Sequence, residues 1–432
     1  MTAGYRRYAM GLLLGIYIIN FLDRQVVNIL AEPIKNDLGL ADWQLGLMSG
    51  LAFALFYTVL GIPIARLAER RNRPVIIGTA IAAWSGFTML CGAAQNFVQL
   101  ILFRIGVGVG EAGCTPPAHS LITDYVPREK RASALAFYAM GTPLGGLLGL
   151  VMGGLIADAY GWRTAFLIAG APGLLFAILA VTTLREPRKQ LSAEMRRIAH
   201  ANQASLGATL SLLATKRTFW LIAFGAAIKA FIGYGHAPFT ASFFLRNHGP
   251  EIERLASNFG LQSLGFLGLA LGLLAGIAGS ISSLLGGFIA DRYSKTDLRG
   301  YVAVPAIASL IGVPIFCMAM LAPSAVMAMS ILILNGLLGS LWYGPVYATG
   351  QSIVPPHMRA TASAILLFII NLIGLGLGPL AVGILSDVLS TGMGLGSAEG
   401  VRWALILSTL AGVVAFALFW IARRTIREEM ES

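Results

Sequence analysis

Four ionisable residues stand inside long apolar stretches of this sequence. Asp23 and Arg24 interrupt the apolar run of residues 11–30, and Arg104 and Glu111 flank the glycine-rich stretch RIGVGVGE. A charge at the centre of a bilayer costs roughly 2.5–3.5 kcal/mol on insertion scales, so intramembrane ionisable residues usually face a cavity and carry function. A buried carboxyl group whose neighbouring cation comes and goes can bind and release a proton. The pattern therefore predicts proton-linked chemistry within a membrane.

The spacing of these residues predicts which of them meet. Arg104 and Glu111 are seven residues apart, so they share a helical face and lie about 10 Å apart along the axis. Asp23 would lie at a depth in the membrane between those of Arg104 and Glu111. If the membrane span that contains Asp23 is adjacent to the span that contains Arg104 and Glu111, an Asp23–Arg104 pair with Glu111 close by is allowed. Glu111, with or without Asp23, would then carry the proton while Arg104 and Arg24 change partners. The alternative is a static buried salt network that holds the two helices together.

The rest of the chain supplies the membrane helices that these residues require. It has 432 residues, of which 56% are hydrophobic and 12% charged, and its mean hydropathy is +0.75. A typical soluble domain is about 25% charged. Apolar runs long enough to cross ~30 Å of hydrocarbon recur along the whole chain. We expect an all-α membrane protein with twelve transmembrane spans, at residues 7–31, 43–66, 75–95, 97–123, 131–157, 163–184, 218–245, 260–290, 301–322, 325–350, 359–386 and 400–422.

The net charge of +11 follows the predicted topology. With the N-terminus in the cytoplasm, most Lys and Arg residues fall in cytoplasmic segments, as the positive-inside rule requires, and both termini are cytoplasmic. The basic residues therefore predict anionic membrane lipids as partners and argue against nucleic acid. The three cysteines are widely spaced in apolar context and indicate neither disulfides nor a metal site. The absence of an Asn-x-Ser/Thr sequon favours a bacterial inner membrane.

The chain divides into two similar halves. The charged segment 185–217 separates an N-terminal six-helix bundle, 1–184, from a C-terminal bundle, 218–432, and residues 192–204 could form a basic amphipathic helix or remain a solvated linker. The loop ARLAERRNR (residues 65–73) recurs as GFIADRYSK (287–295), and VPREKRASA (126–134) recurs as VPPHMRATA (354–362). Two like-oriented halves predict a transporter that rocks about a central site.

The first of these repeated loops predicts a cytoplasmic gate. Its acidic and basic residues recur at matching positions and can pair with neighbouring helix ends in one state and separate in the other. The residues that we assign to this gate are Glu69, Arg70, Arg73, Asp291, Arg292 and Lys295.

These features resemble the major facilitator superfamily over nearly the whole chain. The second copy of the loop matches the family signature Gly-x-x-x-Asp-Arg-x-Gly-Arg well, whereas the first copy departs from it at Ala65, Glu69 and Asn72. The stretches NFLDR and RIGVGVGEA resemble the Spinster branch of this superfamily, which includes carriers of lysolipids and sphingolipid phosphates. That resemblance implies proton-linked movement of an amphipathic lipid. Organic-anion/proton symporters carry a similar Asn-x-x-Asp-Arg and provide the alternative.

The second half offers residues that could contact a substrate. Lys229 lies mid-span in the seventh helix and His236 follows on the same face, so that a cation there could meet an anionic headgroup. Lys229 could instead snorkel or pair with backbone carbonyls. The remaining candidates are aromatic or amide side chains that could line a cavity, although aromatic residues also form interfacial belts: Tyr57, Tyr343, Tyr347 and Asn371.

The sequence argues against an enzyme. It contains no His-Glu-x-x-His, no Gly-x-Ser-x-Gly and no phosphate-binding Gly-rich Lys-Ser/Thr loop. The absence of a nucleotide site favours a secondary carrier over a primary pump. We expect a monomeric, multi-pass protein of the cell inner membrane that uses the proton as its coupling ion, has no other cofactor, and moves a small amphipathic or anionic substrate.

Overall fold

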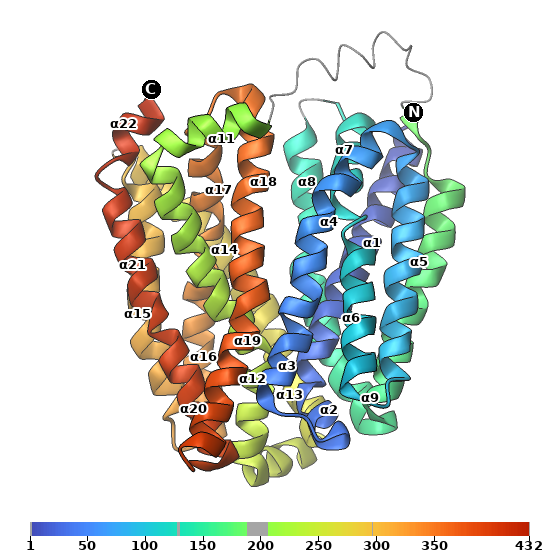
Figure 1. Cartoon of the computed structure of the whole chain (residues 1–432), viewed down its shortest axis with the longest axis vertical. Coiled ribbons are helices and arrows are strands. Elements are labelled where there is room, and N and C mark those ends of the chain that lie inside the picture. The colour runs from blue at the N-terminus through green and yellow to red at the C-terminus, as the bar shows by residue number, and fades with distance from the viewer. Residues whose placement is uncertain (1, 128–129, 188–205, 296, 432) are drawn as a thin grey trace. The chain divides into compact units, whose positions relative to one another are not determined.

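The computed structural model is helical throughout and describes residues 2–127, 130–187, 206–295 and 297–431 (Figure 1). No β-strand occurs within these ranges. Eleven helical stretches are long and apolar enough to cross a membrane. One of them, Ser133–Thr183, accounts for two of the predicted spans, because α9 (Gly141–Thr183) is interrupted at Gly161, whose φ of 82° is left-handed. The predicted all-α membrane fold is confirmed, and the cytoplasmic location of the termini stays a prediction.

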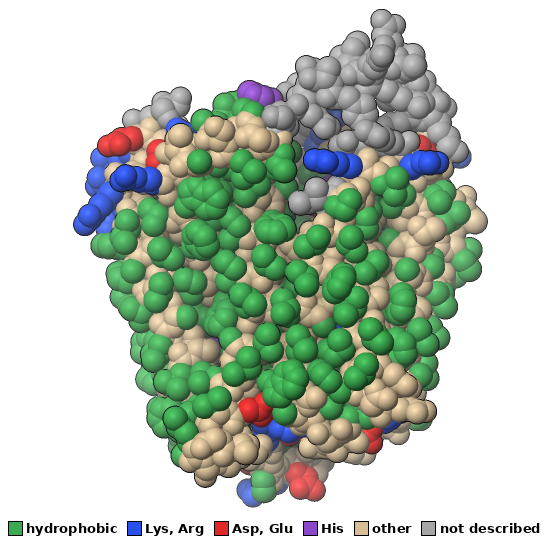
Figure 2. Space-filling view, in the orientation of Figure 1, with side chains coloured by type: hydrophobic (Ala, Val, Ile, Leu, Met, Phe, Trp, Pro, Cys, Tyr) green, Lys and Arg blue, Asp and Glu red, His purple; other side chains and the backbone are tan. Residues whose placement is uncertain are grey.

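The surface has the distribution of side chains expected for a membrane protein. Hydrophobic side chains cover the middle of the visible face, while Lys, Arg, Asp and Glu gather at its upper and lower margins (Figure 2). Many large apolar residues are strongly exposed, among them Leu284 at 76% and Val98 at 65%. Such a surface is stable where hydrocarbon replaces water, because lipid chains solvate apolar side chains.

The helices form two compact units. The first contains residues 1–191 and 237–276, and the second contains residues 192–236 and 277–432. The helices of the first unit are α1 (Ala3–Ile29), α2 (Ala31–Leu38), α3 (Asp42–Ser49), α4 (Leu51–Arg70), α5 (Arg73–Gly92), α6 (Phe97–Glu111), α7 (Thr115–Tyr125), α8 (Arg131–Ala139), α9, the later part of α12 (Arg217–Ser257), and α13 (Ser263–Leu273).

The second unit contains the remaining elements. They are α11 (Leu206–Thr215), the first part of α12, α14 (Gly279–Ser294), α15 (Gly300–Met320), α16 (Ala325–Gly339), α17 (Tyr343–Ser352), the 3₁₀ turn η4 (Pro356–Met358), α18 (Arg359–Ile369), the π-helix η5 (Ile370–Leu377), α19 (Gly378–Asp387), the π-helix η6 (Val388–Gly392), α20 (Gly396–Thr409), α21 (Ala411–Ala422) and α22 (Ile426–Glu431). The π-helix η3 (Leu274–Ala278) contains the boundary between the units.

These units differ from the two bundles drawn from the repeat. The boundary falls within α12, between His236 and Ala237, so the segment 237–276 belongs with the N-terminal helices. The predicted amphipathic helix at 192–204 lies outside the described residues. Of the predicted linker, the described part contains α11, a ten-residue helix with Thr209 and Leu213 buried.

The fourth predicted span is broken in the structure. α6 ends at Glu111, and α7 begins at Thr115 after a short irregular turn. Pro116 and Pro117 follow the break; proline has no backbone N–H to continue the helix, and its ring crowds the preceding turn. The corresponding span of the second half is broken in the same way between α16 and α17, before Pro345. The interruption therefore belongs to the repeat.

Glycines bring the helices around α6 into close contact. A methyl group at Gly108 would lie 2.5 Å from the carbonyl oxygen of Phe53 in α4, and one at Gly110 would lie 2.6 Å from the backbone nitrogen of Trp84 in α5. These separations are too short for any side chain, so the two glycines are needed for backbone packing. α6 is thus held tightly against α4 and α5, with Arg104 and Glu111 at either end of its glycine face.

Candidate functional site

An ion pair between α1 and α6 forms the centre of the site. The Nε atom of Arg24 donates to Oε2 of Glu111 at 2.7 Å. The Glu111 side chain is fully buried, whereas that of Arg24 is 13% exposed. The second carboxylate oxygen, Oε1, is buried without a hydrogen-bond partner among the described residues. The acid of the pair is therefore shielded from solvent, whereas the base keeps some access for a ligand.

Aromatic rings surround the guanidinium of Arg24. Its Cζ atom lies 4.5 Å from the ring centroid of Tyr57, 4.9 Å from that of Phe53 and 5.0 Å from that of Phe21. Phe53 and Tyr57 stack on each other, with an interplanar angle of 15°. A cation held against aromatic faces is stabilised most strongly when water is excluded. Arg24 thus has favourable contacts in addition to its carboxylate partner.

Asp23 points to a different helix from its neighbour. Its Oδ2 atom accepts a hydrogen bond of 3.1 Å from Thr88 in α5, and its Oδ1 atom has no partner among the described residues. The Asp23–Arg104 pair that the spacing allows is not formed in this structure, in which the direct ion pair to α6 comes from Arg24. Adjacent helical residues point about 100° apart, so only one of the two can face Glu111. The buried amide of Asn20, one turn earlier on α1, faces the carboxylate of Glu111.

Arg104 is a buried cation with few polar contacts. Its side chain is 2% exposed, and its recorded hydrogen bond, to the carbonyl of Met48, is long at 3.4 Å. No carboxylate lies within ion-pair distance of it among the described residues. Its guanidinium carbon lies 5.2 Å from the ring centroid of Phe53. Arg104 therefore adds positive potential to the site and packs against the ring that also touches Arg24.

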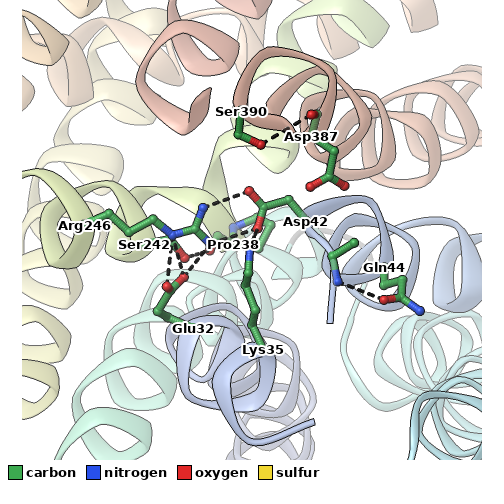
Figure 3. A network of polar contacts seen from close by, with 10 residues as sticks. Glu32, Lys35, Asp42, Gln44, Pro238, Ser242, Arg246, Asp387 and Ser390 are labelled. Atoms are coloured by element: carbon green, nitrogen blue, oxygen red, sulfur yellow. Dashed lines mark hydrogen bonds and ion pairs between the residues drawn. The ribbon is translucent and has the colours of Figure 1, made fainter. Parts of the chain in front are cut away.

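A second buried charge network lies beyond the C-terminal end of α1 and connects α2 and α3 to α12 (Figure 3). The guanidinium of Arg246 binds two carboxylates. Its Nη2 atom lies 2.7 Å from the carboxylate of Glu32, and its Nη1 atom lies 2.8 Å from that of Asp42. Lys35 binds the same Asp42 at 2.5 Å. Glu32 and Asp42 each stand in the first turn of a helix, where the helix dipole favours an acid.

Arg73 is the predicted gate residue with the most extensive contacts. It is fully buried at the start of α5, where its guanidinium binds Asp124 at 2.7 Å, Ser120 at 2.8 Å and the carboxylate of Glu186. Glu186 also accepts the backbone N–H of Arg73 at 2.9 Å, so it is the acid at the N-terminus of α5. The side chains of Glu69 and Arg70 lie outside the described residues.

The second copy of the gate is more exposed. Asp291 accepts a hydrogen bond of 3.0 Å from the hydroxyl of Tyr301 in the first turn of α15. Two residues beyond this loop, Asp297 forms an ion pair with Arg427 of α22 at 3.0 Å. The backbone N–H of Arg299, together with Arg427, holds the pKa of Asp297 below its ordinary value of 3.8. Arg292 and Lys295 are exposed, without a recorded ion pair among the described residues.

The substrate candidates of the second half do not form one cluster of contacts. His236 is buried in α12, where its Nε2 lies 2.9 Å from the hydroxyl of Ser408 and its ring stacks on Phe316. Lys229 is half-buried two turns earlier, and no ion pair to it is recorded within the described chain. Tyr343 and Tyr347 stack together and pack on the core of the second unit, and Asn371 is half-buried in η5.

Sequence reasoning missed several residues of the site. Phe53 and Phe21 were hidden because a ring in an apolar run gives no signal of its own. Arg246 could have been recognised from the sequence. It is a basic residue at the end of an apolar span, on the predicted non-cytoplasmic side of the membrane, where basic residues are rare. Glu32 and Asp42 lie on either side of the short connection between α2 and α3 as candidate partners, so charge complementarity could have predicted the network.

The fold and the site together define a class of membrane protein. A polytopic helical membrane protein with paired charges inside its helices is typical of a secondary transporter. The family model described as Major Facilitator Superfamily matches residues 13–379, and this chain belongs to that family. The predicted assignment, including the view that the chain is not an enzyme, is therefore confirmed.

Relatives of the chain refine this assignment. An MFS-type efflux pump of Mycolicibacterium smegmatis is 34% identical over 429 residues, which cover 98% of this chain and 94% of that protein. The hexuronate transporter of Bacillus subtilis is 26% identical over 66% of this chain and 64% of its own length. The crystal structure of a bacterial homologue of the human lysosomal transporter Spinster, inward-facing and unoccupied, matches with a TM-score of 0.86 and 32% identity over 99% of both chains. The predicted Spinster-like character is thereby confirmed.

Proposed function

We propose that this protein is a proton-coupled transporter that works by alternating access and moves an amphipathic lipid, such as a lysophospholipid or a sphingoid phosphate. The observation that carries the coupling is the buried Arg24–Glu111 pair. Removing one partner of a buried ion pair leaves an uncompensated charge, which costs about 3–5 kcal/mol. Glu111 avoids that cost by taking up a proton whenever Arg24 leaves it.

An anionic substrate group would link this proton to transport. Arg24 is partly exposed, so a phosphate or carboxylate can compete with Glu111 for its guanidinium. When the substrate anion binds the Arg24 guanidinium, Glu111 takes up a proton and becomes neutral. Oε1 of Glu111, which makes no hydrogen bond of its own among the described residues, is the oxygen available for that proton. Binding of the anion and binding of the proton then favour each other. Asp23, buried beside Thr88, is the second candidate for the proton.

The lipid assignment is supported by the Spinster-like features of α1 and α6. The similarity to a bacterial Spinster homologue extends over nearly the entire chain. Lys229 offers a second cation for an anionic headgroup, and Tyr57 belongs to the ring cluster around Arg24. We place the protein in the inner membrane of a bacterium, as a monomer in contact with anionic lipids.

A proton-linked symporter of organic anions or sugar acids is the second candidate. It is favoured by the pattern Asn20-x-x-Asp23-Arg24 and by the similarity to a hexuronate transporter. The same Arg24–Glu111 pair would serve that substrate, because a hexuronate also carries a carboxylate.

Transport by Glu111→Gln in proteoliposomes tests the coupling. Glutamine keeps the shape of the side chain and cannot release a proton. We expect net accumulation driven by a pH gradient to fall to background, while exchange of labelled for unlabelled lysophosphatidic acid continues. The matched control is Glu253→Gln, because Glu253 is exposed on α12. Gradient-driven accumulation by Glu111→Gln at the wild-type rate would disprove the coupling role.

A further inference from the structure

The ring of Phe53 is shared by the two arginines of the site. Its centroid lies 4.9 Å from the guanidinium carbon of Arg24 and 5.2 Å from that of Arg104. Phe53 is 1% exposed, so water does not weaken either contact. Phe21 and Tyr57 also touch Arg24, but a ring contact to Arg104 is recorded only for Phe53 among the described residues.

The position of this ring is fixed by its surroundings. Phe53 lies near the start of α4, and its carbonyl oxygen would be 2.5 Å from a methyl group at Gly108. The glycine face of α6 therefore sets how closely the Phe53 backbone approaches Arg104 and Glu111. Stacking on Tyr57, with centroids 5.4 Å apart, holds the plane of the ring. Phe53 is thus a rigid surface against which both guanidinium groups are placed.

The Phe53 ring stabilises the two protonation states of Glu111 to different extents. While Glu111 is ionised, its charge compensates that of Arg24 at 2.7 Å. Once Glu111 is neutral, the guanidinium is an uncompensated cation, and the negative face of an aromatic ring attracts it more strongly. Arg104 has no carboxylate within ion-pair distance among the described residues and depends on the same ring in both states. Phe53 therefore stabilises the state in which Glu111 holds a proton.

We propose that Phe53 is a positioning residue that holds Arg24 and Arg104 and thereby sets the pH at which Glu111 is protonated. The proposal rests on the proposed proton coupling and extends it to an uncharged residue. The other titratable groups that face Glu111 and the two arginines come from four helices or their ends: Asp23 of α1, Tyr57 of α4, Cys91 of α5 and Cys114 at the start of α7.

Infrared difference spectra of the purified full-length protein would follow Glu111 directly. The carbonyl stretch of its protonated carboxyl group is assigned by its loss in Glu111→Gln and is titrated with pH. Phe53→Leu keeps most of the side-chain volume and removes the aromatic face. We expect its midpoint to move about 0.5–1 pH unit toward acid, since the protonated state is destabilised. Phe53→Tyr should restore the wild-type midpoint, and Phe21→Leu should shift it less, because the ring contact to Arg104 among the described residues comes from Phe53.

Fluorinated phenylalanines at position 53 separate the charge effect from packing. They reduce the negative potential of the ring face and leave its shape nearly unchanged, so they also serve if Phe53→Leu does not fold. We expect the midpoint to move further toward acid with each added fluorine. An unchanged midpoint across this series, or equal shifts for Phe53→Leu and Phe53→Tyr, would overturn the proposal.

A thermal-stability cycle distinguishes failure of this proposal from failure of the proposed function. If no Glu111 band titrates in the wild type, the proposed coupling through Glu111 is wrong. The positioning role is then decided by combining Phe53→Leu with Arg104→Gln. We expect Phe53→Leu to lower the melting temperature less in the Arg104→Gln background than in the wild type, because the ring has lost one of its cations. Strictly additive losses would show that Phe53 does not position Arg104 and would overturn the proposal that one ring holds both arginines.

Discussion

Arg24 is held by contacts that depend on the shape of its side chain. It reaches the Glu111 carboxylate through Nε while its planar guanidinium lies against three aromatic rings. A lysine ammonium is a compact, strongly hydrated charge that cannot reproduce this planar packing. The charge alone is therefore an incomplete description of this residue.

Arg24→Lys tests that conclusion. We expect gradient-driven transport to fall by about tenfold or more, because one or two favourable contacts of roughly 1 kcal/mol each are lost. Arg66→Lys is the matched control, since Arg66 is exposed on α4 and should transport as the wild type does. Initial rates in proteoliposomes at equal protein content measure the difference. Wild-type transport by Arg24→Lys would mean that any positive charge suffices at this position.

The sequence singled out the charged residues of the candidate site but did not predict which two of them form the ion pair. Depth and helical spacing favoured Asp23 as the residue of α1 that approaches Arg104 and Glu111, whereas in the structure it is Arg24 that binds Glu111. Which of two adjacent residues faces a neighbouring helix depends on the rotation of α1 about its axis. Packing against other helices sets that rotation, and an apolar run alone gives it no clear direction. The rings around Arg24 could not be predicted for the same reason.

At the scale of the helices, glycines determine how closely α6 packs. The glycine-rich stretch was read as a face that lets a neighbouring helix approach, and the structure places α4 and α5 against it. The break between α6 and α7 was not predicted, because the apolar pattern continues through it. The break was nevertheless encoded in Pro116 and Pro117, whose effect on a helix is local and known in advance.

Gly110→Ala tests the packing of α6 on α5. The added methyl group would lie 2.6 Å from a backbone atom of Trp84, which cannot move aside as a flexible side chain could. We expect a destabilisation of about 1–3 kcal/mol, seen as a lower melting temperature in detergent. Gly86→Ala is the control, because a methyl group on Gly86 of α5 would meet no atom within 4 Å. Equal melting temperatures for the two variants would contradict the close packing.

The Arg246 network fastens the later part of α12 to α2 and α3. Arg246→Gln would leave Glu32 and Asp42 near each other without their shared cation, with Lys35 as partial compensation for Asp42. We expect a loss of about 3–5 kcal/mol, because breaking a buried pair leaves uncompensated charge. The melting temperature should recover in part in Arg246→Gln combined with Glu32→Gln. Arg254→Gln, at an exposed position of the same helix, should have no effect.

At the scale of the whole molecule, the sequence repeat and the compact units describe different properties. The repeat records matching loops and matching helix breaks in the two halves of the chain. The compact units record which helices pack together, and they assign the segment 237–276 to the N-terminal helices. Sequence similarity between halves could not predict that assignment, because it depends on contacts such as that between Asp158 and the backbone N–H of Gly265.

The class of substrate can be decided with one lysine and two ligands. Lys229 is a half-buried cation of the second unit, with no ion pair recorded among the described residues. If it receives an anionic lipid headgroup, Lys229→Ala should weaken binding of lysophosphatidic acid by about tenfold, the loss of one charge-assisted hydrogen bond of roughly 1.5–3 kcal/mol. Glucuronate should bind weakly to the wild type and to the variant alike. Lys130→Ala, at an exposed position, controls for loss of charge. Tight glucuronate binding by the wild type that disappears in Lys229→Ala, without measurable lysolipid binding, would reject the lipid assignment and favour the sugar-acid symporter.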